Sequence, residues 1–356
     1  MTFYTSMSSF MLKLLFAFSI CLCIYLLYLL LQRRNSYFYI QSKQQALEEQ
    51  QEKEGFLVKN NLVPINDTFA EMPLKEYVIK ASFNSAYGSD EQISKENLRK
   101  IIEDEGVRFL DFGIYEQGNT PVVGFSNSYD NVVGSENTMP FSKVMDAITT
   151  YAFACKNGRD PLFLHLRIKS QSPSILSSIA STLQTTFGDK IYENPVSGDT
   201  KLNVLTNKVI FIMDNSAHYG SGYETILCGK GDKECINLSD IIHMDTSELL
   251  STPEDRAILQ QTNPPGASHG RRTEVQRLRM TTPNLSNYSG VNTSYFFKLV
   301  HDYSVQIVFH QFYTDAVISP DENLLKYKAF FQKQSSAFVP FASALSYINT
   351  NGGPED

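Results

Sequence analysis

The stretch from Pro73 to Ser170 decides the fold. It contains three apolar runs: Glu76-Tyr-Val-Ile-Lys-Ala81, Val107-Arg-Phe-Leu-Asp-Phe-Gly-Ile114 and Pro161-Leu-Phe-Leu-His-Leu-Arg-Ile168. The runs alternate with two helical patterns, at residues 94–105 and 141–155. This alternation of strand and helix predicts a parallel sheet flanked by helices.

Several segments of the chain resemble phosphoinositide-specific phospholipase C. The resemblance to its X region is carried by residues 73–87, 106–113, 121–123, 147–154 and 161–167. A second series, in the same order as the family's Y region, comprises Arg279, residues 286–288, 305–308, Phe312, Thr314, 327–332 and 338–340. The resemblance implies a TIM-type (β/α)8 barrel, in which catalytic groups lie at the carboxyl ends of the strands.

The resemblance also identifies the positions where catalysis would take place. In the family, two histidines act as general acid and base while an inositol hydroxyl attacks the phosphodiester. Here the first histidine corresponds to Phe83 and the second to Asn127, and residues 125–131 contain no histidine. Each positioned acid or base contributes typically ~10²–10⁴ in rate. The sequence therefore predicts an inactive homologue with no catalytic residue.

The calcium site of the family is altered as well. Its asparagine is retained as Asn84, its first glutamate corresponds to Asp111, its aspartate to Gly113 and its last glutamate to Arg167. Calcium prefers six to eight oxygen ligands, and a unit positive charge about 4 Å from it costs roughly 8 kcal/mol at an effective dielectric near 20. We predict that no calcium or other cofactor binds here, and that an ion pair between Asp111 and Arg167, with Asn84 nearby, replaces the metal.

Other residues are weaker candidates. The resemblance makes Arg279, Ser286 and Tyr288 possible contacts for a phosphate or lipid headgroup, although the family's tyrosine two residues after Arg279 is Thr281 here. His165 shares strand parity with Arg167, so both side chains are expected to point inward. His165 is either a base in a remodelled site or, more commonly for a lone barrel histidine, a hydrogen-bonded structural residue.

The N-terminal segment predicts a membrane anchor. Phe10 to Leu31 is about 22 residues long and holds one charge, Lys13, so it is long enough to span a bilayer as a single helix. A cleaved signal peptide is the alternative, but Gln32-Arg33-Arg34 follows the segment in place of small residues. The arginine pair favours a cytosolic position for the rest of the chain.

Two features would suit the opposite side of the membrane. The chain has five Asn-X-Ser/Thr sequons, at Asn66, Asn237, Asn284, Asn287 and Asn292. Cys228 and Cys235 flank a short glycine-rich segment that could be a bridged loop in an oxidising compartment.

The composition sets the remaining limits. A net charge of -7 gives no basic footprint for nucleic acid. The expected organisation is an anchor (1–34), a stalk and linker (35–72), an X-like half barrel (73–215), an X/Y-type linker (216–270), a Y-like half barrel (271–345) and a polar tail (346–356).

Three functions remain open at this point. The first is a membrane-anchored, inactive phospholipase-C-like domain that binds a phosphoinositide headgroup or a protein partner. The second is a divergent calcium-independent phosphodiesterase that uses His165, Asp111 and Arg279. The third is a purely structural component of a membrane or particle.

Overall fold

A computed structural model describes Leu22, Tyr25 and most of the chain from residue 61 onward. The described ranges are 61–126, 132–214, 222–224, 226–228, 236–246, 278–281, 292, 294–314 and 321–351. The chain divides into two units, and of the first (1–58 with 317–319) only Leu22 and Tyr25 are described, both helical. The second unit (59–316 with 320–356) holds all the elements described below.

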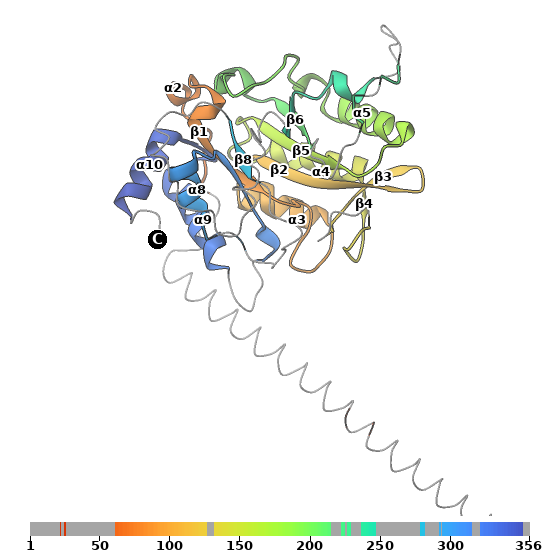
Figure 1. Cartoon of the computed structure of the whole chain (residues 1–356), viewed down its shortest axis with the longest axis horizontal. Coiled ribbons are helices and arrows are strands. Elements are labelled where there is room, and N and C mark those ends of the chain that lie inside the picture. Colours follow the sequence, from red (N-terminus) through yellow and green to blue (C-terminus); the bar gives the residue numbers. More distant parts are fainter. Residues whose placement is uncertain are drawn as a thin grey trace, which may run out of the picture. The chain divides into compact units, whose positions relative to one another are not determined.

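The second unit is an α/β domain (Figure 1). Its strands are β1 (Tyr77–Ser82), β2 (Phe109–Gln117), β3 (Thr120–Gly124), β4 (Met139–Pro140), β5 (Leu162–Ile168), β6 (Val209–Met213), β7 (Met244–Asp245), β8 (Met280–Thr281), β9 (Ile307–His310) and β10 (Phe338–Pro340). Its helices are α2 (Asp67–Ala70), α3 (Lys95–Arg99), α4 (Phe141–Ala152), α5 (Pro173–Phe187), α8 (Phe296–Tyr303), α9 (Glu322–Gln334) and α10 (Phe341–Thr350). A π-helical turn, Lys100–Asp104, continues α3.

One sheet joins both predicted half barrels. Its strand order is β7-β6-β5-β2-β1-β9-β8, and every neighbouring pair in this order is parallel. The three strands and two helices predicted from the first stretch are confirmed to within a few residues. The described residues thus hold seven parallel strands with no pairing between β7 and β8, compared with the eight of the expected closed barrel.

Three expectations about the second half need correction. The last predicted strand exists as β10, but it runs antiparallel to β1. The segment 216–270 was expected to be an X/Y-type linker, yet it supplies β7, whose Met244 is buried. The polar tail starts later than expected, because α10 continues to Thr350 and buries Ile348 on the same face as Phe341 and Ala344.

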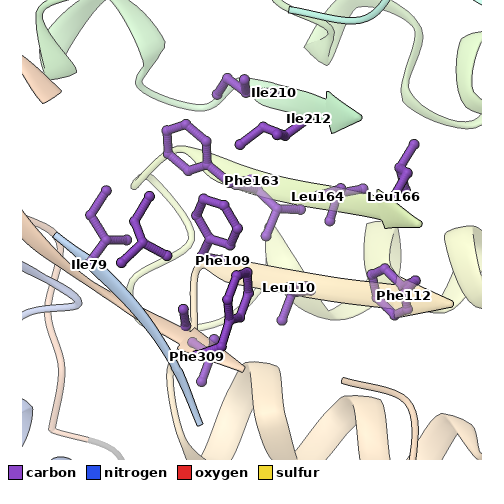
Figure 2. Close-up of a cluster of buried hydrophobic side chains, with 14 of the residues drawn as sticks. Ile79, Phe109, Leu110, Phe112, Phe163, Leu164, Leu166, Ile210, Ile212 and Phe309 are labelled. Atoms are coloured by element: carbon purple, nitrogen blue, oxygen red, sulfur yellow. The ribbon is translucent and has the colours of Figure 1, made fainter. Parts of the chain in front are cut away.

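The core is built from the alternating side chains of the parallel strands (Figure 2). Phe109 of β2 stacks on Phe163 of β5, with ring centroids 5.5 Å apart, and meets Phe309 of β9 edge to face at 5.3 Å. All three rings are buried, and burying one such side chain contributes roughly 1.5–3 kcal/mol. This packing fixes the strands on which the candidate site is built.

The predicted membrane anchor falls on Phe10–Leu31, which lies outside the described residues except for Leu22 and Tyr25. Among the described residues, no helix combines the length and the apolar character that crossing a bilayer requires.

Candidate functional site

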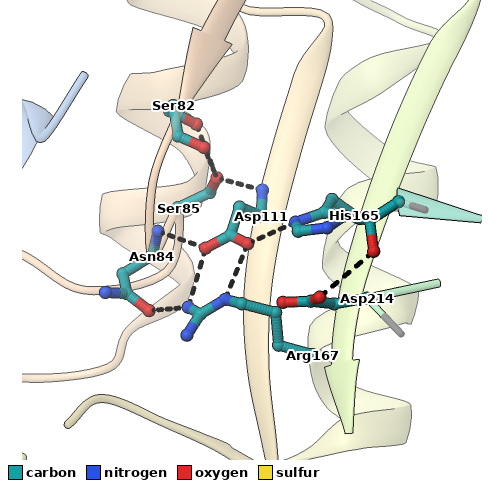
Figure 3. Close-up of polar contacts among 8 residues, drawn as sticks. Ser82, Asn84, Ser85, Asp111, His165, Arg167 and Asp214 are labelled. Atoms are coloured by element: carbon teal, nitrogen blue, oxygen red, sulfur yellow. Dashed lines mark hydrogen bonds and ion pairs between the residues drawn. The ribbon is translucent and has the colours of Figure 1, made fainter. Parts of the chain in front are cut away.

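The candidate site lies at the carboxyl ends of β1, β2 and β5 (Figure 3). The parallel register of β2 and β5 sets Asp111 opposite His165 and Gly113 opposite Arg167. Residues two apart on a strand share a face, so Asp111 and Arg167 point to the same side. Asn84 reaches this group from the turn that follows β1.

Asp111 and Arg167 form a buried, bidentate ion pair. The Arg167 Nε donates to Asp111 Oδ1 at 2.8 Å, and Arg167 Nη2 donates to Asp111 Oδ2 at 2.8 Å. Both residues are almost completely buried. The ion pair predicted from the sequence is therefore confirmed. Paired bonds of this kind are the strongest that arginine makes with a carboxylate.

Asn84 completes the arrangement. Its φ of 48° lies in the left-handed region, which asparagine tolerates better than most residues. In this turn its backbone N–H donates to Asp111 Oδ2 at 2.9 Å, and its side-chain Oδ1 accepts a bond from Arg167 Nη2. Asn84 thus holds both members of the ion pair, as expected, and its buried Nδ2 has no hydrogen-bond partner.

The charge of Asp111 is stabilised by its neighbours. Burial alone would raise the pKa of this carboxyl, but Arg167 and His165 outweigh burial and lower it to about 2. His165 Nδ1 lies 2.7 Å from Asp111 Oδ1, and the Asp111 backbone N–H donates to Ser85 Oγ. Asp111 is therefore an anion at neutral pH whose oxygens all face donors within the protein.

The residues present do not fit a calcium ion. The two Asp111 oxygens accept the bonds of Arg167, and Gly113 offers no side-chain ligand. A Cβ placed on Gly113 would come 3.6 Å from Arg167 Nη2 and 3.2 Å from the Gly124 carbonyl oxygen, so the glycine leaves space beside the guanidinium. Among the described residues no cluster of three or more His, Cys, Asp or Glu side chains could hold a metal.

Of the two positions aligned with catalytic histidines, the structure describes Phe83. Phe83 is buried, and its ring lies under the guanidinium of Arg167, with Cζ 4.4 Å from the ring centroid. A phenyl ring transfers no proton, so this position supports the pair without taking part in acid or base chemistry. Asn127 lies outside the described residues.

His165 is placed as a structural residue. Its side chain is fully buried, its Nδ1 is engaged with Asp111, and its Nε2 has no hydrogen-bond partner. The ring is 5.6 Å from Phe309 and 6.5 Å from Phe109, between centroids. A general base must reach the proton that it removes, and this nitrogen is enclosed by the aromatic core.

The other sequence candidates are not brought to this site. Arg279 directly precedes β8, and the register through β9 and β1 places it about five residues below the level of Asp111, roughly 16 Å along the strands. Its Nη1 donates to the carbonyl oxygen of Tyr303 at 2.9 Å, at the end of α8. Ser286 and Tyr288 lie outside the described residues.

Two further groups, near the carboxyl ends of the parallel strands, were not predicted from the sequence. Asp214 directly follows β6 and is buried, and Thr246 Oγ1 donates to its Oδ1 at 3.2 Å. Tyr87 stacks on Phe125 at 4.1 Å, and Tyr313 meets both rings edge to face. Asp214 could have been predicted, because it is a polar residue directly after an apolar strand. The contact of the three aromatic residues could not, because they lie far apart in the chain.

A pocket of about 190 Å³ opens beside this aromatic group, between the loops after β1 and β9 and the helices α3 and α9. Lys100 and Lys328 line it together with Glu105. The carboxylate of Glu105 is shared by two lysines, since Lys328 Nζ lies 2.6 Å from Oε1 and the buried Lys80 Nζ lies 3.4 Å from Oε2. Among the charged side chains that line the pocket, two lysines accompany one carboxylate, which gives a net positive charge of one.

Known proteins share both sequence and fold with this domain. Residues 70–213 match the family model of the phosphatidylinositol-specific phospholipase C X domain. No curated protein matches the chain.

Solved phospholipases C resemble the structure at low sequence identity. PLC21 of L. pealei is 15% identical over 80% of this chain, with a TM-score of 0.50, and PLC21 of S. officinalis is 19% identical over 44% of it, with a TM-score of 0.34. The chain spans 40% and 20% of these two proteins, respectively. The calcium-dependent enzyme of a Pseudomonas species is 11% identical over 72% of this chain and 95% of its own, with a TM-score of 0.42. The likeness to the L. pealei protein shows a shared fold.

Proposed function

Since residues 70–213 belong to the phosphatidylinositol-specific phospholipase C X-domain family, we propose that the barrel is a non-catalytic member of it, which binds a phosphoinositide headgroup at a membrane. The observation that carries this proposal is the bidentate pair of Arg167 and Asp111, because it occupies both oxygens of the carboxylate that a metal would otherwise use. The chain would hold the domain at the membrane through its N-terminal apolar segment.

The same pair opposes cleavage. Removing a proton from an inositol hydroxyl needs a base that can reach it. The described position aligned with a catalytic histidine is Phe83, and the Nε2 of His165 is enclosed. Arg279, the third group that a divergent hydrolase would use, belongs to the opposite end of the strands. These placements favour binding over the alternative of a calcium-independent phosphodiesterase.

The positively charged pocket is the part of the described surface best suited to a headgroup. Lys100 is exposed on its rim and Lys328 is held by Glu105, while the phenolic rings of Tyr87 and Tyr313 form an apolar wall. Phosphate groups are attracted by such clustered lysines. A purely structural role would need neither the pocket nor its charge.

Catalysis and metal binding are tested together. The domain from residue 61 onward, incubated with phosphatidylinositol and its phosphorylated forms, should release no inositol phosphate with or without calcium. Calcium should also leave its melting temperature unchanged, whereas in Arg167→Glu it should raise the melting temperature, because two facing carboxylates then need a cation. Calcium-dependent product release by the natural sequence would refute the proposal.

Binding is tested with vesicles. The full chain should sediment with detergent-permeabilised vesicles that carry phosphorylated phosphatidylinositol. For a soluble form from residue 61, the sedimented fraction should be several-fold larger with such vesicles than with vesicles of phosphatidylcholine alone. Lys100→Ala should weaken this preference, while Lys95→Ala, an exposed lysine on α3 that does not line the pocket, should preserve it. Equal sedimentation of both variants would show that the pocket is not the binding site.

A further inference from the structure

Cys228 and Asn66 carry an inference that does not depend on the proposed function. Cys228 is buried and disulfide-bonded, whereas Cys155 is a free thiol. The partner of Cys228 lies outside the described residues. Cys21 and Cys23 belong to the apolar N-terminal segment, so Cys235, seven residues after Cys228, is the partner that the sequence leaves.

A disulfide of this kind has a consequence for location. Cytosolic thiols are kept reduced, and structural disulfides persist where the surroundings are oxidising. The Cys228 loop is also ordered by another contact, because Asn237 Oδ1 accepts bonds from the backbone N–H groups of Leu227 and Cys228 at 2.7 and 3.0 Å. Cys228 is thus held by a second contact besides its disulfide. A structural disulfide argues for a domain that folds on the oxidising side of a membrane.

On that side, Asn-X-Ser/Thr sequons become acceptors for N-linked glycans. The structure separates the described sequons by access. Asn292 is buried, and its Nδ2 donates to Gln311 O, Thr314 Oγ1 and Asp321 Oδ2 at 3.1, 3.0 and 2.8 Å. A sugar on that nitrogen would leave one N–H for three acceptors and would not fit the core. Asn237 is only half-buried, but its side chain holds the Cys228 loop.

Asn66 is different. It is exposed, it precedes the short helix α2, and only its Oδ1 is used, in a 2.9 Å bond from the Thr68 backbone N–H. A glycan on Nδ2 leaves that bond intact. We propose that the domain resides in an oxidising compartment, held by a Cys228–Cys235 disulfide, and that Asn66 is an N-glycosylation site. This reverses the placement that Arg33 and Arg34 favoured, which rested on a difference of very few charges.

The glycan is tested on the full chain expressed in eukaryotic cells. Digestion with an endoglycosidase that removes N-linked glycans should increase its mobility on a denaturing gel. Thr68→Ala removes the sequon but keeps the backbone N–H that Asn66 bonds, so the mobility change should be lost. Thr68→Ser keeps both and should retain it. No mobility change in the natural sequence, or a full change that persists in Thr68→Ala, overturns Asn66 as the site.

The disulfide is tested without relying on a variant that folds. The chain is denatured in the presence of an alkylating reagent, with and without prior reduction, and the labelled thiols are counted. Reduction should add two labels, and the gain should be absent when Cys228→Ser and Cys235→Ser are combined. Cys155, free in the structure, should be labelled in both conditions. Equal labelling with and without reduction overturns the oxidising placement.

Discussion

Arg167 and Arg108 are buried arginines from neighbouring strands, at opposite ends of the same sheet, and they are neutralised in different ways. Arg167, at the mouth, faces a carboxylate through two bonds. Arg108, just before β2, donates mainly to backbone carbonyl oxygens, at 2.6 Å to Ala152, 2.5 Å to Asp160 and 3.4 Å to Pro161. Burial lowers the pKa of Arg108, with Cys155 and Asp160 acting in the opposite direction.

The difference separates two kinds of buried charge. Backbone carbonyls are supplied by any sequence, so Arg108 fastens the loop between α4 and β5 without requiring a partner side chain. Arg167 depends on one particular carboxylate, at a position that the family uses for a metal. The buried ion pair of Arg167 and Asp111 should therefore show strong coupling between two residues, whereas Arg108 should show little coupling to any one side chain.

The largest effect is expected from breaking the pair at the mouth. Arg167→Ala and Asp111→Ala each leave a buried charge without its partner, which typically costs about 3–5 kcal/mol. The double variant removes both charges and should lose less than the sum, as a double-mutant cycle in urea denaturation would measure. Additive losses would mean that the two side chains do not interact in solution.

Asp160 lies at the same end of the sheet as Arg108. Its effect on the pH dependence of stability should have the opposite sign to that of Asp111. Burial raises the pKa of Asp160 to about 6, partly offset by the bond from the Ile65 N–H. The native state then binds more protons than the unfolded state between about pH 4 and 6, so this group lowers stability as pH rises through that window. The shift corresponds to at most about 3 kcal/mol.

Asp160→Asn keeps an oxygen acceptor for Ile65 and removes the titration. The free energy of unfolding of this variant, minus that of the natural sequence, should therefore increase from pH 4 to pH 7. Asp111 contributes in the other direction, because its lowered pKa stabilises the fold above about pH 4 and this stability is lost as pH falls towards 2. A difference that does not change with pH would contradict the assignment of Asp160.

Arg108→Met should lower the free energy of unfolding by about 2 kcal/mol. The carbonyl oxygens lose a charged donor, but the cost of burying the charge also disappears and offsets part of that loss. Combining Arg108→Met with Asp160→Asn should give a weaker coupling than that of Arg167 and Asp111, because Asp160 offsets only part of the effect of burial on Arg108. A coupling as large as that of Arg167 and Asp111 would remove the distinction between the two ends.

The smallest effect concerns the ring beneath Arg167. Phe83→Leu removes a cation–π contact, worth roughly 1 kcal/mol in a partly desolvated site. Phe309→Leu is the matched control, because Phe309 is also buried and pairs edge to face with Phe83 at 6.2 Å. In the natural sequence, Phe83→Leu should lower the free energy of unfolding more than Phe309→Leu does. In an Arg167→Met background the two variants should lose the same amount, and thermal denaturation measures both cases.

The sequence predicted the contact of Asp111 with Arg167 because the resemblance places both residues at one metal site and because β2 and β5 are neighbouring strands. Strand parity and adjacency of β2 and β5 are enough to bring Asp111 beside Arg167, and the turn after β1 supplies Asn84. Arg279 lies away from Asp111 because its level along the sheet depends on the pairing of β8 with β9, which a two-residue strand does not signal. The same lack of signal hid β7 inside the expected linker.

By itself, the sequence determined the alternation of strands and helices, because this follows from the period of the apolar residues. It also showed the resemblance to phospholipase C, from which the substitutions at Phe83, Gly113 and Arg167 were inferred. Only the tertiary structure decided which carbonyl oxygens accept the bonds of Arg108, the enclosure of His165 by Phe109 and Phe309, and the access of Asn66 as opposed to Asn292. These properties depend on contacts between residues far apart in the chain. The burial and hydrogen bonding of these residues are set by tertiary packing, which the pattern of residues along the chain does not predict.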